Sequence, residues 1–209
     1  VGVYIPEEYG GLGGGIMEMC LVVEELCRVD GAAGLGYAAC GLGTFPIIIG
    51  GTEEQKKKYL PRLAAGEIIA AFALTEAGAG SDVANIKTTA EEVDDGFVLN
   101  GTKQFITNAG FADLYTVYAK VDGDGFTAFI VEAAREGVST GSEEHKMGIR
   151  GSSTCSVVLQ DARIPEANLL GERGKGHVIA FNILNVGRFK LGAMTTAGAK
   201  ASVGVATEY

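Results

Sequence analysis

The sequence predicts an α+β fold in which helices come first, short strands follow and helices return. Three patterns indicate it. Apolar residues between Ile16 and Cys27 recur at the spacing of one helix face. After Gly66 the period of the apolar residues falls from 3.6 to 2, which is typical of strands. Past Gly176 the helical pattern returns, rich in Ala and Gly, and continues to Tyr209.

Three helices are expected in the first part of the chain. The first covers residues 16–27, and the second is an apolar, Gly- and Ala-rich segment over residues 32–49 that we expect to be buried. Thr52 and Gln55 have the spacing of a capping box, in which a hydroxyl and an amide satisfy each other's free backbone N–H groups. A third helix should therefore begin there and end within residues 61–66.

Short strands are expected in the middle of the chain. They cover residues 97–99, 105–107, 114–121, 126–131 and 155–159. Turn residues stand between them at Gly96, Asn100-Gly101, residues 122–125 and Glu136-Gly137. Short strands at this spacing indicate an antiparallel barrel or a sandwich.

Composition excludes several classes of function. The net charge of −9 argues against nucleic acid, since a phosphate backbone needs clustered Lys and Arg. The hydrophobic fraction of 47% and the charged fraction of 21% are those of a soluble globular protein. No uninterrupted apolar stretch reaches about 18 residues, so no transmembrane segment is expected. No signal peptide is recognisable at the start of the sequence.

The cysteines and histidines do not form a metal site by spacing. The four cysteines (Cys20, Cys27, Cys40 and Cys155) include no CxxC pair, and two histidines cannot complete a tetrahedral site with them. We expect free thiols in a reducing compartment. Chemistry would then come from an organic cofactor or from acids and hydroxyls.

A Gly-rich loop is the first candidate for chemistry. Residues 72–82 read FALTEAGAGSD, so a strand runs into bare backbone flanked by the hydroxyls of Thr75 and Ser81. Such a loop can bind a phosphate or the edge of a polar ring. The spacing alone favours an ordinary tight turn, because neither a Walker nor a Rossmann pattern is present. Glu76 and Asp82 flank the loop as possible bases, although carboxylates there are more often turn or cap acceptors.

Two further segments are weaker candidates. Residues 105–109 read FITNA and suit either a strand edge facing an aromatic ligand or an ordinary sheet face. Gly187-Arg188 lies in an apolar helix, where an arginine more often pairs with an acid than touches a ligand. His145 stands among charged residues and is expected in a surface loop.

Taken together, these strings resemble the acyl-CoA dehydrogenase family in order and spacing. FALTEAGAGSD and FITNA are joined by five more strings in register: IPEEYGGLG (5–13), GTEEQKKKYLP (51–61), MGIRGSST (147–154), DARIP (161–165) and NLLG (168–171). The resemblance covers essentially the whole chain. Within the family, ILNVGRF at residues 183–189 is most similar to the very-long-chain branch.

The resemblance implies a fold and domain boundaries. It implies a partial helical N-terminal domain over residues 1–70, an antiparallel β-barrel middle domain over 71–175 and the start of a C-terminal four-helix domain over 176–209. It also implies that the chain is an internal piece of a longer protein, without the opening helices and most of the last domain.

The resemblance also implies site residues. FAD would be held by Phe72, Leu74, Thr75, Gly80 and Ser81 on one side, and by Phe105, Ile106 and Thr107 on the other. Thr75 would lie at the pyrimidine edge of the flavin, Ser81 near the pyrophosphate and Thr107 close to N5. Ser81, Asn185 and Arg188 would face the acyl-CoA substrate. No metal is implied.

The implied reaction is α,β-dehydrogenation of an acyl-CoA in fatty-acid β-oxidation, with electrons passed to an electron-transferring flavoprotein. One of the two places the family uses for its glutamate base corresponds to Gly187, which has no side chain. The base is therefore expected beyond Tyr209, and these residues alone should be inactive.

The alternatives to a dehydrogenase are an acyl-CoA oxidase and a non-catalytic assembly scaffold for respiratory complexes. A homodimer or homotetramer is expected, in the cytoplasm of a bacterium or the matrix of a mitochondrion.

Overall fold

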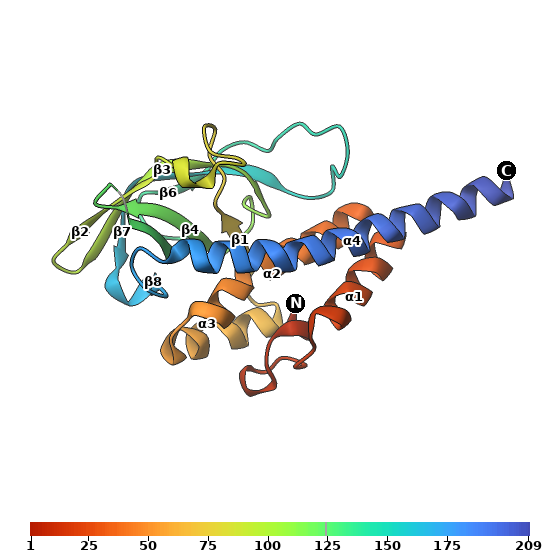
Figure 1. Cartoon of the computed structure of the whole chain (residues 1–209), viewed down its shortest axis with the longest axis horizontal. Helices are drawn as coiled ribbons and strands as arrows, with labels where there is room; N and C mark the ends of the chain where they lie inside the picture. Colours follow the sequence, from red (N-terminus) through yellow and green to blue (C-terminus); the bar gives the residue numbers. More distant parts are fainter. Residues whose placement is uncertain (124) are drawn as a thin grey trace.

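The computed structural model describes residues 1–123 and 125–209 and contains a group of helices packed against a curved sheet (Figure 1). The helices are α1 (Ile16–Val29), α2 (Gly31–Gly50), α3 (Glu53–Ala65) and α4 (Gly176–Glu208). The strands are β1 (Ala70–Ala73), β2 (Thr89–Val93), β3 (Gly96–Thr107), β4 (Leu114–Val121), β5 (Gly125–Glu132), β6 (Val138–Thr140), β7 (Thr154–Pro165) and β8 (Leu169–Leu170). The predicted α+β fold class, with helices before and after a block of strands, is confirmed. The turn expected at residues 122–125 includes Asp124, which lies outside the described residues.

The strands form one sheet in the order β6-β7-β3-β2-β4-β5-β8, with β1 added beside β4. Most neighbours are antiparallel, as predicted, but β1 pairs with β4 in parallel over four residues and β2 with β4 over two. The parallel pairing of β1 is possible because the β2–β3 hairpin intervenes before the chain returns in the same direction. Side chains from β1 to β5 and from β7 share one core, including Leu99, Val117, Phe129 and Val157. A core enclosed by one curved sheet is the arrangement of a small barrel.

Strand β3 differs from the prediction, which had two strands separated by a turn at Asn100-Gly101. The structure has one strand with a register shift between Leu99 and Gly101. Gly101 has φ +154°, and a Cβ there would stand 2.4 Å from Thr88 Oγ1. The glycine therefore allows a close backbone approach and a bulge, not a chain reversal.

The capping box at the start of α3 is confirmed. Thr52 N donates to Gln55 Oε1 at 3.0 Å, and Gln55 N donates to Thr52 Oγ1 at 3.2 Å. Helix α3 ends at Gly66, whose left-handed φ of +75° closes the last turn. Gln55 also donates from Nε2 to the carbonyls of Ala167 and Leu169 at 2.8 and 2.7 Å. The cap therefore also ties α3 to the last strand.

Helix α2 corrects the expectation that no apolar stretch is long enough to span a membrane. An 18-residue stretch of this 20-residue helix has a mean hydropathy of 1.6, and it is the one helix in the described residues that is long and apolar enough by composition. More than half of that stretch is buried inside the fold. The helix packs against β1, where a Cβ at Gly43 would stand 2.5 Å from the Ala70 carbonyl carbon. These contacts fit the predicted role of a buried core helix.

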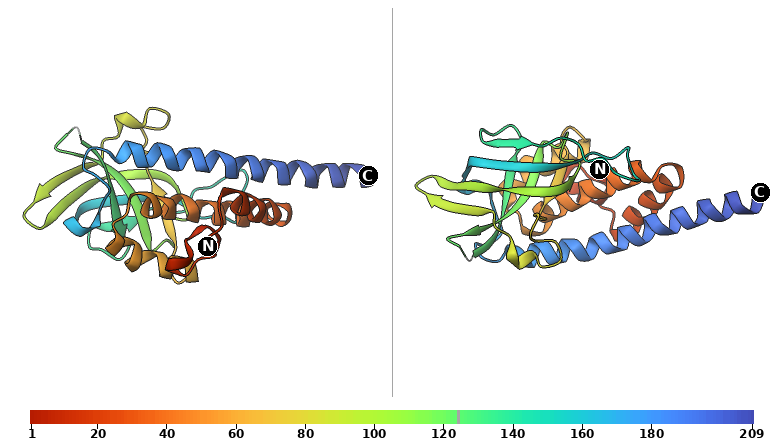
Figure 2. Two further views of the ribbon diagram at one scale, coloured as in Figure 1. Left: turned by 60° about the horizontal axis from the view of Figure 1, so that its bottom comes forward. Right: turned by 90° about the horizontal axis from the view of Figure 1, so that it is seen from above.

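Helix α4 crosses the molecule beside α2 and α1, and its C-terminal part extends past the other elements (Figures 1 and 2). Its first half is anchored by Ile179, Ala180 and Ile183, which join a second core with α1, α2, α3 and one face of the sheet. Farther along, Lys200 forms an ion pair with Glu24 of α1 at 2.5 Å. Helices α2 and α4 therefore pack side by side on the same face of the sheet, and this positions the candidate site.

Candidate functional site

A buried ion pair fixes the Gly-rich loop that follows β1. Lys103 Nζ lies 2.7 Å from Glu76 Oε1, and the lysine side chain is completely buried. Lys103 also donates to the Leu74 carbonyl at 3.3 Å, while Gln104 N donates to the Thr75 carbonyl at 2.8 Å. Strand β3 therefore holds the backbone of residues 74–76 from beside it.

Glu76 is fully used by these contacts and is not a free base. Its carboxylate also accepts from the backbone N–H of Lys87 at 2.6 Å and from Thr88, through N–H at 3.1 Å and Oγ1 at 2.5 Å. Burial alone would raise the pKa of Glu76, but Lys103 and Thr88 outweigh it and lower the pKa. Burial lowers the pKa of Lys103 to about 8 against the opposing effect of Glu76. Asp82, the other candidate base, is exposed at the N-terminus of a short 3-10 turn.

Beyond the ion pair the loop is open. A Cβ at Gly78 or Gly80 would meet nothing within 4 Å, and Ser81 is exposed. Thr75 is half-buried at the start of this stretch. Bare backbone beside two hydroxyls and open space is the kind of surface that binds a phosphate or a polar ring edge. The residues present therefore fit a ligand with such groups.

The end of β3 presents an aromatic ring to solvent in a strained backbone. Phe105 has φ +57°, at a second register shift of the strand between Lys103 and Ile106, and is 57% exposed. A bulky residue in the left-handed region is uncommon and usually marks a turn or a functional constraint. The side chain of Ile106 points the other way into the sheet core. Only the backbone of Ile106 is thus available to a ligand beside Phe105 and Thr107.

Thr107 connects this strand end to an apolar cavity of about 310 Å³ between α2 and α4. Leu35, Ala38, Ala39 and Leu42 line it from α2, and Leu184, Gly187, Arg188, Lys190, Leu191 and Met194 line it from α4. The volume is at the lower end of small-molecule sites, and an apolar wall with few polar groups is typical of them. The structure therefore brings Thr107, Gly187 and Arg188 together around one cavity.

The other predicted substrate residues lie outside this cavity. Asn185 is exposed and accepts a hydrogen bond from Arg188 Nη1 one turn later on α4. Arg188 pairs with this amide and, within the described chain, with no acid. Ser81 lies on the Gly-rich loop. Phe72, which was predicted to bind FAD and not the substrate, is half-buried in β1, with its ring centroid 5.2 Å from that of Tyr118.

Lys190 is a buried cation that the sequence interpretation missed. It is 2% exposed, and its Nζ donates to the Ala38 carbonyl at 2.7 Å. Burial lowers the pKa of Lys190 to about 8, opposed by the nearby Cys40 and Cys20 thiols. Its ammonium also lies 5.7 Å from the centroid of the Phe45 ring. A lysine in a largely apolar stretch of helix was the one signal available.

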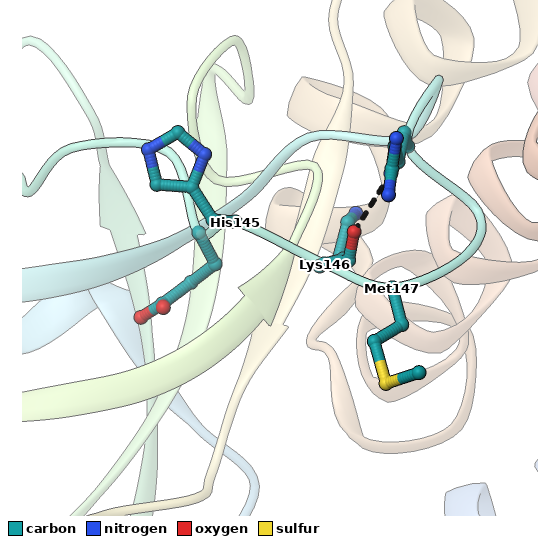
Figure 3. A pocket seen from close by; sticks show the side chains of 5 residues that line it. His145, Lys146 and Met147 are labelled. Atoms are coloured by element: carbon teal, nitrogen blue, oxygen red, sulfur yellow. Dashed lines mark hydrogen bonds between the residues drawn. The ribbon is translucent and has the colours of Figure 1, made fainter.

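A larger surface hollow, of about 590 Å³, is less suited to a ligand. It is lined by Glu144, His145, Lys146, Met147 and Arg150, all from one loop (Figure 3). The labelled side chains of His145 and Met147 point to different sides, and Met147 is 99% exposed. His145 therefore lies in a surface loop, as predicted. Because no second element contributes a wall, we do not place a site here.

The cysteines are free, with Cys40 and Cys155 buried and Cys20 and Cys27 partly buried. In residues 1–123 and 125–209, no group of three or more His, Cys, Asp or Glu side chains is placed to hold a metal ion.

Comparison with known proteins places these features in a family. Residues 1–67 match the family model "Acyl-CoA dehydrogenase, N-terminal domain", and residues 71–162 match "Acyl-CoA dehydrogenase, middle domain". A probable acyl-CoA dehydrogenase of Bacillus subtilis is 55% identical over the whole chain. Two solved structures superpose with a TM-score of 0.96 over the whole chain. One is an acyl-CoA dehydrogenase from Bacillus anthracis complexed with FAD, at 53% identity, and the other is butyryl-CoA dehydrogenase from Megasphaera elsdenii, at 43%.

The chain spans 36% of the length of the two Bacillus proteins and 57% of the Megasphaera enzyme. None of these matches distinguishes one branch of the family from another. Two models of one family together cover most of the chain, in the order that the structure shows as helices and then sheet. The chain therefore belongs to the acyl-CoA dehydrogenase family, of which it carries the N-terminal and middle domains.

Proposed function

We propose that this chain forms the flavin-binding face and part of the acyl cavity of an enzyme that dehydrogenates acyl-CoA thioesters with FAD. One observation carries the proposal. Thr107 ends the strand that presents Phe105, and it also lines the apolar cavity between α2 and α4. A flavin bound on Phe105 and Thr107 would therefore adjoin an acyl chain in that cavity. The relatives named acyl-CoA dehydrogenase support the same assignment.

The residues that would hold FAD are those predicted from the resemblance. Thr75, Gly80 and Ser81 offer hydroxyls and open backbone, and Leu74 is fixed in place by Lys103. Phe105 offers an apolar ring face, and Thr107 a hydroxyl. FAD would supply the redox chemistry by accepting a hydride from the substrate. The protein's contribution is to fix this surface in advance, as the Glu76–Lys103 pair does.

The apolar cavity would hold the acyl chain and exclude water from it. Its wall consists of Leu, Ala, Met and Gly side chains from α2 and α4, with Thr107, Arg188 and Lys190 as the polar members. Excluding water strengthens hydrogen bonds to the thioester oxygen, and the α-proton is not acidic enough without them. The hydrogen bond to Asn185 orients Arg188 at the cavity wall.

We propose that the catalytic base is not among these residues. Within the part of the chain that the structure describes, the cavity is lined by no Asp or Glu. Glu76 is held by Lys103, Thr88 and the Lys87 N–H, away from this wall. Gly187 lines the cavity where some branches of the family place their glutamate. A glutamate from another segment would complete the site.

We infer a role in fatty-acid β-oxidation, electron transfer to an electron-transferring flavoprotein and membership of the very-long-chain branch, all from the resemblance of the sequence. A homodimer or homotetramer is supported by apolar side chains exposed on α4, among them Phe181, Phe189 and Val203. The domain limits 1–70, 71–175 and 176–209 follow the change from helices to strands and back. The compartment would be a bacterial cytoplasm or a mitochondrial matrix.

The proposal is tested on the full-length protein that contains this chain and supplies the base, by an anaerobic titration of the purified, FAD-loaded protein with saturated acyl-CoAs of graded chain length. Flavin absorbance that bleaches with one range of chains supports dehydrogenation and identifies the substrate class. Reoxidation by oxygen faster than by an electron-transferring flavoprotein would favour an oxidase instead. Failure to bind FAD, with the fold intact, would contradict the roles of Thr75, Ser81, Phe105 and Thr107. Bound flavin that no acyl-CoA reduces would favour a non-catalytic role.

A further inference from the structure

Lys190 is a buried lysine in the wall of the proposed acyl cavity. Thr107 is the cavity's wall on the sheet side. The Lys190 side chain reaches from α4 to α2, where Nζ donates to the Ala38 carbonyl at 2.7 Å. Ala38 and Lys190 both line the cavity. The lysine therefore bridges, at the cavity wall, the two helices that form the cavity.

The space that receives the ammonium is kept free by a glycine. A Cβ at Gly41 would stand 3.0 Å from Lys190 Nζ, 3.4 Å from the Phe45 ring and 3.5 Å from Tyr4 Cζ. The Tyr4 and Phe45 rings stack with their centroids 4.8 Å apart. The lysine side chain thus separates the cavity from a second packed region formed by α1, α2 and the first turn of the chain. Tyr4 Oη in that region is buried and has no hydrogen-bond partner in the described residues.

A lysine at this position is unfavourable for the stability of the fold if packing is its only role. Within residues 1–123 and 125–209, no carboxylate lies within ion-pair distance of Lys190, and one carbonyl is its hydrogen-bond acceptor. A buried ammonium without a counter-ion costs several kcal/mol, and Leu or Met would fill the same volume without that cost. Its ammonium end is unfavourable for the apolar tip of an acyl chain, which would lose contacts and displace a hydrogen bond there.

We propose that Lys190 determines chain-length specificity by closing the cavity toward α1 and limiting how far an acyl chain can extend. The proposal rests on the proposed function, because it requires that the cavity bind an acyl chain. Acyl-CoAs that fit short of Lys190 should gain about fourfold in affinity with each added methylene. Longer chains should gain nothing further, since the added carbons would have to displace the bridge between α4 and α2.

Calorimetric titration of the FAD-loaded protein with graded saturated acyl-CoAs tests this proposal. The chain length at which affinity stops rising is measured for wild type, Lys190→Ala and the volume-matched Lys190→Met. Lys190→Ala should move that limit by about four carbon atoms toward longer chains, because it removes four heavy atoms from the wall. Lys190→Met should keep the wild-type limit, since it keeps the wall, and should bind chains near the limit more tightly.

A third variant covers the case in which Lys190→Ala does not fold. Lys190→Val removes less of the side chain and should move the limit by a smaller step in the same direction. An unchanged limit in every folded variant overturns the role of Lys190 and leaves the proposed function in place. Wild-type protein that binds FAD but no acyl-CoA of any length overturns the proposed function and this inference with it.

Discussion

Lys103 and Glu76 form a buried ion pair, with 2.7 Å between Nζ and Oε1, that joins strand β3 to the start of the Gly-rich loop. The pair lies between two segments that the sequence interpretation assigned to FAD. Each partner makes further hydrogen bonds, to Leu74, Lys87 and Thr88, so its capacity is largely satisfied. The two sides of the proposed flavin surface are therefore held in register before any ligand binds.

Replacing one partner of this pair should be strongly destabilising. Glu76→Gln leaves the Lys103 ammonium buried without a counter-ion, and we expect a loss of about 3–5 kcal/mol in the free energy of unfolding. Urea denaturation measures it. The exposed pair of Arg28 and Glu25 is the control, and Arg28→Ala should cost less than about 0.5 kcal/mol. Similar losses in the two variants would contradict the assignment of Glu76 to a structural role.

The ion pair also gives stability a dependence on acidic pH. Hydrogen bonds and the Lys103 charge outweigh the opposing effect of burial and lower the pKa of Glu76 in the folded protein. Its contribution is therefore complete above the unfolded-state pKa and is lost as the pH falls through the folded-state value. Glu76→Gln should remove this part of the acid dependence, so the stability curves of variant and wild type should converge at low pH.

Lys190 should make the stability of the fold depend on pH in the alkaline range. Burial lowers its pKa from 10.5 to about 8, so between those values the unfolded chain binds more protons than the folded one. Stability from this group therefore rises with pH across that window, by about 3 kcal/mol if its full effect is realised. The neighbouring Cys20, Cys40 and Tyr4 have raised pKa values and oppose this rise in stability, in wild type and in a Lys190→Met variant alike.

The difference between Lys190→Met and wild type isolates this effect. Met fills a similar volume and carries no charge, so the variant should be more stable at pH 8 and its advantage should shrink toward pH 10.5. Denaturant midpoints measured at intervals across that range give the difference. A constant offset between the two proteins would mean that Lys190 does not titrate there.

Phe105 should show opposite effects on folding and on cofactor binding. Phe105→Gly removes a strained φ of +57° and an exposed ring, so the FAD-free protein should gain about 1 kcal/mol in stability. Loss of the ring should weaken FAD binding by about tenfold. Phe111 is also exposed, but its φ is not positive, so Phe111→Gly should give no such gain in stability. Thermal melts without FAD and fluorescence titration with FAD measure the two effects.

A glycine contact between α2 and β1 should tolerate no side chain. A Cβ at Gly43 would stand 2.5 Å from Ala70 C and 2.6 Å from Ala71 N, both of them backbone atoms that cannot move easily. Gly43→Ala should therefore cost about 3 kcal/mol or more. At Gly192, on the exposed side of α4, a Cβ meets nothing, and Gly192→Ala should stabilise the helix by about 0.5–1 kcal/mol. Melting temperatures that move in the same direction would contradict this contrast.

Helices were more predictable from the sequence than strands, for physical reasons that particular residues illustrate. Thr52 and Gln55 specify the start of α3 locally, through hydrogen bonds within one turn. Strand β2 was missed because its sequence, TAEEV, has only Ala90 buried, and its structure depends on pairing with β3. Strands β6 and β8 are three and two residues long and were missed for the same reason.

The candidate site was predictable only in part. The loop at 74–81 and the strand end at 105–107 carry recognisable sequence strings, and the structure places them on either side of Lys103. The cavity has no such string, because Leu35, Ala39 and Met194 resemble any apolar helix residues. Lys190 and Ala38 are 152 residues apart, and only the crossing of α4 over α2 brings them together. Long-range packing of this kind leaves no local signal in the sequence.

Gly187 offers a direct test of where the base belongs. It lines the cavity with Thr107, and a Cβ there would stand 3.2 Å from Leu42 Cδ2, the mobile end of a side chain that can move aside. Gly187→Glu would place a carboxylate in an apolar enclosure, which raises its pKa toward the range of a general base. In the wild-type 209-residue chain loaded with FAD, acyl-CoA should not reduce the flavin. In the Gly187→Glu variant of the same chain, acyl-CoA should reduce the flavin slowly. Gly187→Gln matches the size without the charge, and equal flavin reduction by the Glu and Gln variants would contradict a base at this position.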